Sequence, residues 1–372
     1  MTEPIYSPGL EGVIAGETAI STIAGGLRYR GYSIEDLAEH ASFEETAFLL
    51  LRGELPNQEE LAAFSKRLAE HAAVPREIFE VLRQLPPKSS MMDAMRSGAS
   101  LLAHWDPDTA DNSHDADVRK AERLLAQLPI ILCARHRLRN ANAIVPPDAG
   151  RGFAENLLWM LNGESPSSQA IKAMDVSLIL YAEHEFNASA FTARVVASTL
   201  ADLHSAITAA IGALKGPLHG GANERVMEVL EEVGSPDRAE SWVRDALANK
   251  VKIMGFGHRV YKTGDPRAEY LKPLCRQLAA ETGNTDLETI ADTIENIVRG
   301  EKKLPPNLDW PSARLYYYLG LPVDLYTPLF VVSRVVGWSA HVIEQHDNNR
   351  IIRPRSRYTG AAPRSWIDIA DR

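Results

Sequence analysis

The feature that most constrains the fold is a helical period in the apolar residues, which dominates from Ile34 onward. The clearest stretch spaces its apolar residues by 4, 3, 4, 4 and 3 positions: Val196, Leu200, Leu203, Ile207, Ile211 and Leu214. This spacing forms one stripe along a helix, so it predicts a helix from about Thr192 to the helix-breaking Gly216-Pro217. A second apolar helix is predicted from Thr327 to Gln345, with Arg334 as its interior charge.

One segment departs from this pattern. Residues 10–33 are punctuated by glycine and carry short β-branched runs, which predicts a small N-terminal β-hairpin. We therefore expect an all-α fold that is mainly helical, with this hairpin as its one strand region.

Five shorter helices are predicted between the two long ones, over residues 223–233, 237–250, 266–282, 285–299 and 311–319. Pro273 lies inside one of these segments and argues against an unbroken helix there. A block of short helices between two long ones indicates an inserted lobe. We expect a small mobile domain at residues 221–320 and a discontinuous large domain at residues 1–220 and 321–372.

Composition restricts the compartment and the partners. The 372 residues carry a formal net charge of −9 with the two signs mixed, so nucleic acid is not an expected partner. No signal-like start and no uncharged apolar stretch of about 18 residues occurs, so no membrane association is expected. Cys133 and Cys275 lie far apart, which suits a reducing compartment. We expect a cytoplasmic protein.

A short bend is rich in positive charge, although the chain as a whole is acidic. Residues 255–267 read GFGHRVYKTGDPR and combine one histidine, three cationic side chains and three glycines just before a predicted helix. Such a local concentration of positive charge in an acidic chain indicates a site for a small anion.

Titratable residues stand near the predicted helix starts at three junctions. They are His219 in GPLHGGANE, His258 in the bend, and Asp309 in NLDWP. A helix start favours negative charge, so His219 should prefer its neutral form and donate a hydrogen bond to a forming enolate. His258 is suited to polarise a carbonyl group. Asp309 is suited to act as a base if partial burial raises its pKa.

Each residue also has an ordinary structural interpretation, and none decides the function alone. His219 fits a hydrogen-bonded loop histidine, and both Asp309 and Asp265 fit helix caps. Arg267, in the first turn of a predicted helix, opposes the helix dipole and favours a bound anion. Arg334 in an apolar helix needs either a buried carboxylate or a ligand carboxylate.

Taken together, the segments resemble the citrate synthase family over essentially the whole chain. The matching segments are GPLHGGANE (216–224), GFGHRVYKTGDPR (255–267), NLDW (307–310), SRVVGWSAHVIEQHDNNRIIRPR (333–355), YAEHEFNAS (181–189) and TAR (192–194). The resemblance implies a mainly helical homodimer whose small domain closes on substrate. It implies condensation of acetyl-CoA with oxaloacetate through an enolate and citryl-CoA, then hydrolysis to citrate and CoA.

The resemblance also implies roles for individual residues. His219 resembles the histidine that donates to the thioester oxygen while Asp309 removes a methyl proton, and His258 resembles the one that polarises the oxaloacetate ketone. The residues that resemble the oxaloacetate-binding set are His184, Arg267, Arg334 and, from the other subunit, Arg353. The segment that resembles the CoA-binding region comprises Ile253, Met254, Gly255, Gly257 and Lys262. No metal and no tightly bound cofactor is implied, because the CoA thioester is a co-substrate.

Several alternatives stay open at this point. A 2-methylcitrate synthase using propionyl-CoA shares these motifs, and an enzyme could accept both thioesters. Trp310 resembles the methylcitrate enzymes, whereas Arg353-Pro354-Arg355 resembles citrate synthases, which we prefer. Family-like sequence begins near Gly9, without the extension of the hexameric NADH-regulated relatives, so we expect a dimer.

Two other protein classes are less well supported by the sequence. A metal-dependent hydrolase using His184, His219, His258 and Asp309 lacks a metal-binding motif such as HExxH. A non-catalytic protein that binds carboxylates or CoA would have no need of the intact set His219, His258 and Asp309.

Overall fold

The computed structural model describes residues 6–258, 261 and 264–372. Sixteen α-helices lie in this part of the chain. They are α1 (Ile34–His40), α2 (Phe43–Arg52), α3 (Gln58–His71), α4 (Arg76–Gln84), α5 (Met91–Leu102), α6 (His114–Arg139), α7 (Phe153–Asn162), α8 (Ser168–Tyr181), α9 (Ala188–Ala197), α10 (Leu203–Leu214), α11 (Ala222–Val233), α12 (Pro236–Ala248), α13 (Pro266–Thr282), α14 (Asp286–Lys302), α15 (Asp309–Tyr318) and α16 (Tyr326–Asp347). The mainly helical fold is therefore confirmed.

The predicted hairpin is present with one further strand. Strands β1 (Ser21–Thr22), β2 (Arg28–Tyr29) and β3 (Tyr32–Ser33) form an antiparallel sheet in the order β1-β2-β3. Arg30 and Gly31 join β2 to β3, and both have positive φ, as a two-residue hairpin turn requires.

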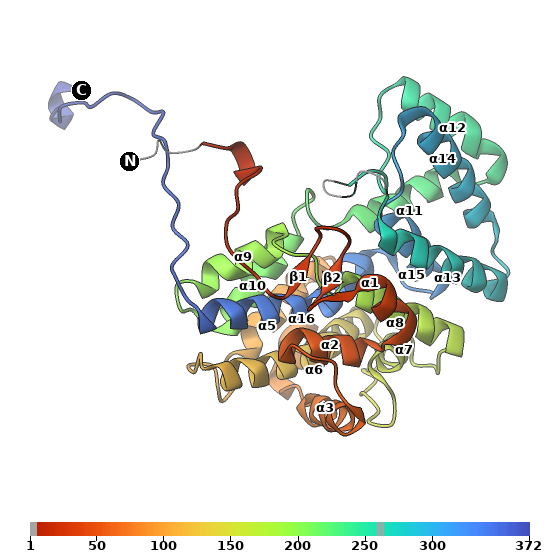
Figure 1. Ribbon diagram of the computed structural model, residues 1–372, viewed down its shortest axis with the longest axis horizontal. Helices are drawn as coiled ribbons and strands as arrows, with labels where there is room; N and C mark the ends of the chain where they lie inside the picture. The colour runs from red at the N-terminus through yellow and green to blue at the C-terminus, as the bar shows by residue number, and fades with distance from the viewer. Residues whose placement is uncertain (1–5, 259–260, 262–263) are drawn as a thin grey trace.

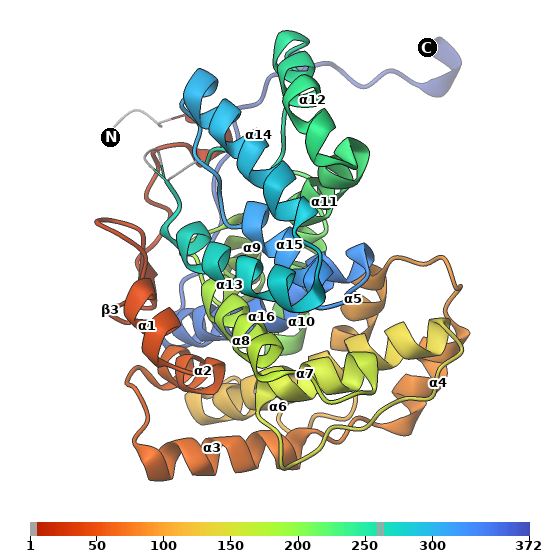
Figure 2. The same cartoon turned by 90° about the vertical axis from the view of Figure 1, so that its right-hand side faces the viewer.

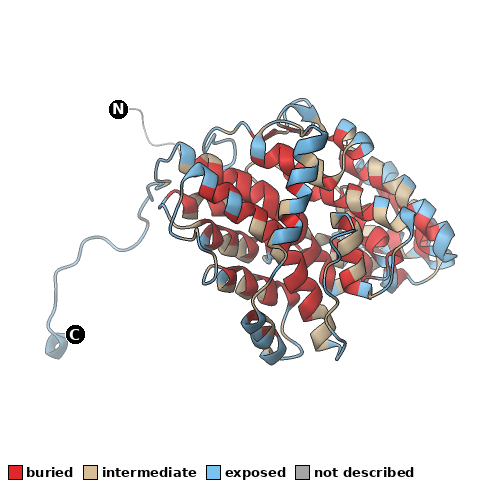
Figure 3. Cartoon of the chain, turned by 90° about the horizontal axis from the view of Figure 1, so that it is seen from below, coloured by how far each residue is buried: buried red, intermediate tan, exposed pale blue. Residues whose placement is uncertain are grey.

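Helix α16 forms the centre of the molecule, and the prediction of a helix over residues 327–345 is confirmed within two residues at each end. Its neighbours include α2, α6, α8, α9 and α10. Figure 3 shows buried residues concentrated in the central helices and exposed ones on the outer helices and the C-terminal segment. A Cβ atom at Gly337 would collide with the carbonyl oxygen of Ala182, so glycine lets α16 approach the chain just after α8.

The prediction of one long helix from Thr192 to Gly216 is wrong, because the structure has two separate helices there, α9 and α10. Leu200 fits the apolar stripe but has a φ of 63° and is 61% exposed. The Asp202 side chain accepts a hydrogen bond from the backbone N–H of Ser205 and so caps a new helix. The two helices then pack against each other.

The five shorter helices are confirmed, with two boundary corrections. α14 continues through Gly300 to Lys302, and α15 begins at Asp309, two residues before Pro311. Pro273 lies inside an α13 that matches the predicted range. In Figures 1 and 2, α12 and α14 lie at one end of the molecule. α13 and α15 lie between that pair of helices and the region where α8 and α16 pack. Within the described ranges, no helix is long and apolar enough to cross a membrane.

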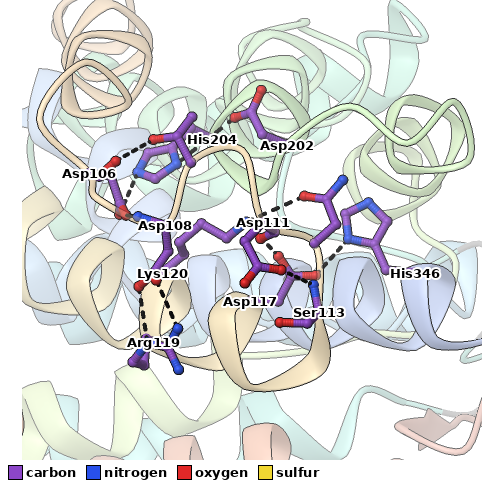
Figure 4. Close-up of polar contacts among 12 residues, drawn as sticks. Asp106, Asp108, Asp111, Ser113, Asp117, Arg119, Lys120, Asp202, His204 and His346 are labelled. Carbon is purple, nitrogen blue, oxygen red and sulfur yellow. Dashed lines mark hydrogen bonds and ion pairs between the residues drawn. The ribbon is translucent and has the colours of Figure 1, made fainter.

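A buried charge network ties the C-terminal end of α16 to the start of α6 (Figure 4). Lys120 and Asp117 form a fully buried ion pair at 2.8 Å between Nζ and Oδ1. His346 Nδ1 lies 2.6 Å from Asp117 Oδ2, and Lys120 Nζ also donates to the carbonyl oxygen of Asp111. The network holds the point from which the C-terminal segment leaves the helical body.

The Lys120→Met substitution tests this network. It should destabilise the fold by about 3–5 kcal/mol, because it leaves the Asp117 carboxylate buried without its cation. Thermal unfolding should show a clearly lowered midpoint. Lys66→Met removes an exposed lysine 3.8 Å from Glu70 and should change stability by about 1 kcal/mol or less. Equal midpoints for the two variants would contradict the assigned role of the buried pair.

Candidate active site

His219 lies in the loop between α10 and α11. A Cβ atom at the following residue, Gly220, would collide with the carbonyl oxygen of Leu214, so the loop needs glycine there. The backbone N–H of Ser189 donates to His219 Nε2 at 3.2 Å, so a neutral ring carries its proton on Nδ1. Burial, with a smaller effect from the Arg334 charge, lowers the pKa of His219 to about 4. Burial therefore favours the neutral form that was expected from the sequence.

Asp309 is the first residue of α15. Its Oδ1 accepts a hydrogen bond from the Tyr181 hydroxyl at 2.8 Å, and its backbone N–H donates to Asn307 Oδ1 at 3.1 Å. Burial raises the pKa of Asp309, although the Tyr181 hydrogen bond and the charge of Arg267 oppose the increase. A half-buried carboxylate with a raised pKa is a stronger base than an exposed one.

His258, Tyr261 and His184 form a ring cluster beside Arg267. The backbone N–H of Tyr261 donates to His258 Nδ1 at 3.3 Å, which puts the proton of a neutral ring on Nε2. His184 Nε2 lies 3.1 Å from the Tyr261 hydroxyl, and the two histidine ring centroids are 5.3 Å apart. Burial, then the charges of Arg267 and Arg334, lowers the pKa of His184 well below its usual value.

Arg267 is buried and already holds a carboxylate from its own chain. Its Nε and Nη2 atoms donate to Asp265 Oδ1 and Oδ2 at 3.0 and 2.9 Å. Asp265 Oδ1 also accepts the backbone N–H of Arg267, so its predicted capping role is confirmed. Its Oδ2 accepts the backbone N–H of Leu308 at 3.1 Å, which connects the Arg267 site to the residue before Asp309.

Arg334 is buried in α16, one turn after Phe330. Its Nε donates to the carbonyl oxygen of Tyr181 at 2.5 Å, and its guanidinium lies 4.6 Å from the Phe330 ring centroid. No ion pair to Arg334 occurs in the described part of the chain. Burial lowers its pKa to about 10, partly offset by the nearby Glu183 carboxylate. Both options left open by the sequence thus stay open: the buried Glu183 carboxylate favours the charge of Arg334 without a direct ion pair in the described part of the chain, and a ligand carboxylate could supply one.

The Phe330 ring lies beside His219 and beside Tyr181, the residue that bonds Asp309. Its ring centroid lies 6.5 Å from that of His219 and 4.6 Å from that of Tyr181, which bonds Asp309. His219, Tyr181 and Arg334 therefore border one apolar ring, and the proposed base is hydrogen-bonded to Tyr181.

Residues 253–257 lie against the segment that leads into α15. Gly257 N–H donates to the carbonyl oxygen of Pro305 at 2.8 Å, and Asn307 N–H donates to that of Gly255 at 2.9 Å. Gly255 has a φ of 87°, and a Cβ atom there would lie 2.8 Å from Trp310. Ile253 and Gly255 are buried, whereas Met254 and Gly257 are partly exposed. Lys262, the cationic member of this predicted set, lies outside the described residues.

Arg353 lies apart from the cluster within a single chain. It is exposed on the extended C-terminal segment and lines a cavity of about 1070 Å³ together with Phe186, Arg194 and Glu344. Among the described residues, no group of three or more His, Cys, Asp or Glu side chains could hold a metal ion. The metal-hydrolase alternative therefore has no ligand set in this part of the chain.

The sequence interpretation missed four residues that position the predicted ones. Ser189 orients His219, Tyr181 bonds Asp309, Asp265 holds Arg267, and Tyr261 contacts both His184 and His258. Tyr181 and Ser189 lie in a segment that the resemblance had marked, but only their contacts reveal what they do.

The protein-family model described as "Citrate synthase, C-terminal domain" matches residues 9–355 of this chain. The chain belongs to the citrate synthase family. It is therefore an enzyme, as members of this family are.

Curated citrate synthase family members are similar over nearly the whole chain. Citrate synthase 2 of Bacillus subtilis (strain 168) is 49% identical over 366 residues, covering 98% of both chains. The 2-methylcitrate synthase of Shewanella oneidensis is 46% identical over 368 residues, covering 98% of this chain and 97% of the relative. Both activities thus occur among relatives of comparable similarity.

Solved structures of the family share the fold. The citrate synthase of Pyrobaculum aerophilum matches with a TM-score of 0.91 at 39% identity, covering 98% of this chain and 97% of the other. That of Thermoplasma acidophilum, described as a ternary complex with carboxymethyl coenzyme A and oxaloacetate, matches with a TM-score of 0.92 at 36% identity, covering 98% and 99%.

The lowered pKa of His219 predicts a dependence of stability on pH. Because an unfolded histidine titrates near 6.5, the unfolded state binds this proton more tightly, and stability falls as the pH drops from about 6.5 towards 4. At pH 5 the loss from His219 should be about 2 kcal/mol. His219→Asn should therefore lose less stability than the unsubstituted enzyme between pH 7.5 and 5 in urea unfolding. Equal losses would contradict a buried neutral His219.

Proposed function

We propose that this member of the citrate synthase family condenses acetyl-CoA with oxaloacetate and water to give citrate and CoA. The observation that carries the proposal is a chain of contacts: the Phe330 ring lies beside Arg334, beside His219 of lowered pKa, and beside Tyr181, whose hydroxyl bonds the Asp309 carboxylate of raised pKa. That grouping suits a reaction that forms an enolate next to a bound dianion. No tightly bound cofactor takes part, since CoA enters as a thioester and leaves as a thiol.

The first step is removal of a proton from the thioester methyl group. Asp309 takes this proton, while Nδ1–H of His219 donates to the thioester oxygen, on which negative charge develops. A methyl proton of a thioester is too weakly acidic for a carboxylate in water, so the donor and the base must be in place together with water excluded. The raised pKa of Asp309 brings base and substrate closer in proton affinity.

The second step forms the carbon–carbon bond. The enolate carbon attacks the ketone carbon of oxaloacetate, and Nε2–H of His258 donates to the ketone oxygen, which becomes the hydroxyl of citryl-CoA. Arg267, Arg334 and His184 hold the two carboxylates, for which arginine has suitable geometry. Water then adds to the thioester carbonyl, the carbon–sulfur bond breaks, and citrate and CoA thiol leave.

The roles divide between the two proposed domains. His184, His219 and Arg334 belong to the proposed large domain (1–220 and 321–372), and His258, Arg267 and Asp309 to the proposed small one (221–320). The hydrogen bonds that cross the boundary at the site include one from Tyr181 to Asp309 at 2.8 Å and one between His184 and Tyr261 at 3.1 Å. A hinge motion that breaks and restores them would open the site to substrates and close it for chemistry. The backbone of residues 253–257, with Lys262, is the proposed contact for CoA.

The alternative is a 2-methylcitrate synthase that uses propionyl-CoA, which differs by one methyl group on the acyl chain. One methylene in an apolar pocket changes discrimination by only about 1–3 kcal/mol. Trp310 favours this alternative, as does the similarity to the Shewanella enzyme.

We also propose that the enzyme is cytoplasmic, in keeping with its two buried free thiols, Cys133 and Cys275.

A second copy of the chain is proposed to complete the site. The C-terminal segment extends away from the helical body (Figure 1), and it exposes Tyr358, Trp366 and Ile369 by 78%, 80% and 84%. Large exposed apolar side chains on an extended segment suit a partner surface. A homodimer in which this segment carries Arg353 to the partner's site would account for its position outside the single-chain cluster.

Release of CoA thiol in the presence of oxaloacetate tests the activity and the base. The unsubstituted enzyme should have a higher kcat/KM with acetyl-CoA than with propionyl-CoA. Asp309→Asn should lower kcat by about a thousandfold while oxaloacetate binding, followed by calorimetry, persists. Asp292→Asn, on the exposed side of α14, is the matched control and should retain full activity.

Each result can contradict a separate part of the proposal. A higher kcat/KM with propionyl-CoA would select the methylcitrate alternative. Turnover retained by Asp309→Asn would remove it as the base, and oxaloacetate binding without thiol release by the unsubstituted enzyme would indicate a non-catalytic protein.

Subunit complementation tests the shared site. Arg353→Ala and Asp309→Asn should each be nearly inactive, but a co-refolded mixture should recover about a quarter of full activity, because half of the dimers then hold one intact site. Activity should be measured at equal total protein. A mixture no more active than its components would exclude Arg353 exchange between subunits.

A further inference from the structure

A buried carboxylate that the proposed mechanism does not use lies directly behind the oxaloacetate site. Glu183 is fully buried in the segment between α8 and α9, next to His184. Its Oε1 accepts a hydrogen bond from Ser21 Oγ at 3.1 Å and lies 2.9 Å from His341 Nε2. Its Oε2 is buried and has no hydrogen-bond partner among the described residues.

The His341 contact leaves the negative charge of Glu183 in place. Arg194 Nη1 lies 3.1 Å from His341 Nδ1, and because arginine only donates, Nδ1 accepts and the ring proton is on Nε2. His341 therefore donates to Glu183 as a neutral ring. The charge of Arg194 is matched by Glu344, whose Oε2 lies 2.6 Å from Arg194 Nη1.

Arg334 is a buried arginine whose charge acts on Glu183 without a direct ion pair among the described residues. Gly337, less than one turn after Arg334 on α16, has no room for a Cβ atom because Glu183 Oε2 and the Ala182 carbonyl lie against it. Burial opposes ionisation of Glu183 and so acts to raise its pKa, whereas the hydrogen bonds from His341 and Ser21 and the charge of Arg334 act to lower its pKa. Glu183 in turn favours the charged form of Arg334.

We propose that Glu183 is the resident counter-charge of the oxaloacetate site, a positioning residue that acts through Arg334 and limits how tightly the site holds a dicarboxylate. The inference rests on the proposed role of Arg334. Each of the two arginines that one chain places in the site is then matched by one buried carboxylate, Arg267 by Asp265 and Arg334 by Glu183. The two buried carboxylates offset the positive charges of the two arginines. The attraction between the arginines and the substrate carboxylates is therefore weaker than it would be without Asp265 and Glu183.

Glu183→Gln tests the charge while keeping the shape. The amide oxygen can replace Oε1 and accept from both Ser21 and His341, so the main change is loss of one negative charge. The KM for oxaloacetate should fall about three- to tenfold, with a steeper dependence on salt concentration, because the field of Arg334 is no longer opposed. An unchanged or raised KM would overturn the proposal.

Two controls separate charge from packing. Ser21→Ala removes a hydrogen bond to Glu183 but keeps its charge, so the KM should not fall. Glu122→Gln neutralises another buried carboxylate, which pairs with Arg52 and Arg67 on the far side of α6, and should lower thermal stability without changing the KM. A lowered KM in either control would mean that the effect does not come from the charge of Glu183.

Calorimetric titration with oxaloacetate alone keeps this inference distinct from the proposed activity. Failure of the proposed activity appears as absent thiol release by the unsubstituted enzyme, whereas failure of the inference appears as equal oxaloacetate affinity in Glu183→Gln. If that variant does not fold alone, oxaloacetate should restore folding by supplying the missing negative charge. Lack of rescue would also overturn the inference.

Discussion

A permanently charged arginine in the central helix is the constraint on which much of this structure depends. Arg334 is buried in α16, and burying a charge without compensation costs several kcal/mol. The compensation comes from the Tyr181 carbonyl, the Phe330 ring and the Glu183 carboxylate. The Phe330 ring lies on α16 itself, but the Tyr181 and Glu183 contributions require α16 to lie close to the end of α8, which glycine at position 337 permits. The same close approach fixes His184, the residue that follows Glu183.

The arginines also control the histidines. The charges of Arg267 and Arg334 both lower the pKa of His184, and that of Arg334 lowers the pKa of His219. Burial is the main cause of both shifts, and the cations that suit a dicarboxylate add to it in the empty site. A neutral histidine ring has a single N–H, so its neighbours must determine which nitrogen carries the proton. Ser189 does this for His219, and Tyr261 does it for a neutral His258.

The sequence predicted what depends on local pattern and missed what depends on contacts across the chain. The range of α16 follows from its unbroken apolar period, and that of α13 from Pro266 and Gly283 at its ends. The break between α9 and α10 was missed because Leu200 continues the apolar stripe while its backbone leaves the helix. Asp265 could be predicted as a cap, but its pairing with Arg267 depends on side-chain geometry. The Ser189–His219 contact joins residues 30 positions apart, and no spacing rule connects them.

Substrate binding should change the electrostatics in a useful direction. Two carboxylates placed against Arg267 and Arg334 would cancel the positive field that helps to lower the pKa of His184 and His219, leaving burial as the main opposing effect. The pKa of each histidine would then rise towards its ordinary value, while burial still favours the neutral rings. Of the two, His219 is the proposed donor to the thioester oxygen. Binding oxaloacetate before acetyl-CoA would thus change the charge around this donor before the thioester arrives, in addition to any domain closure.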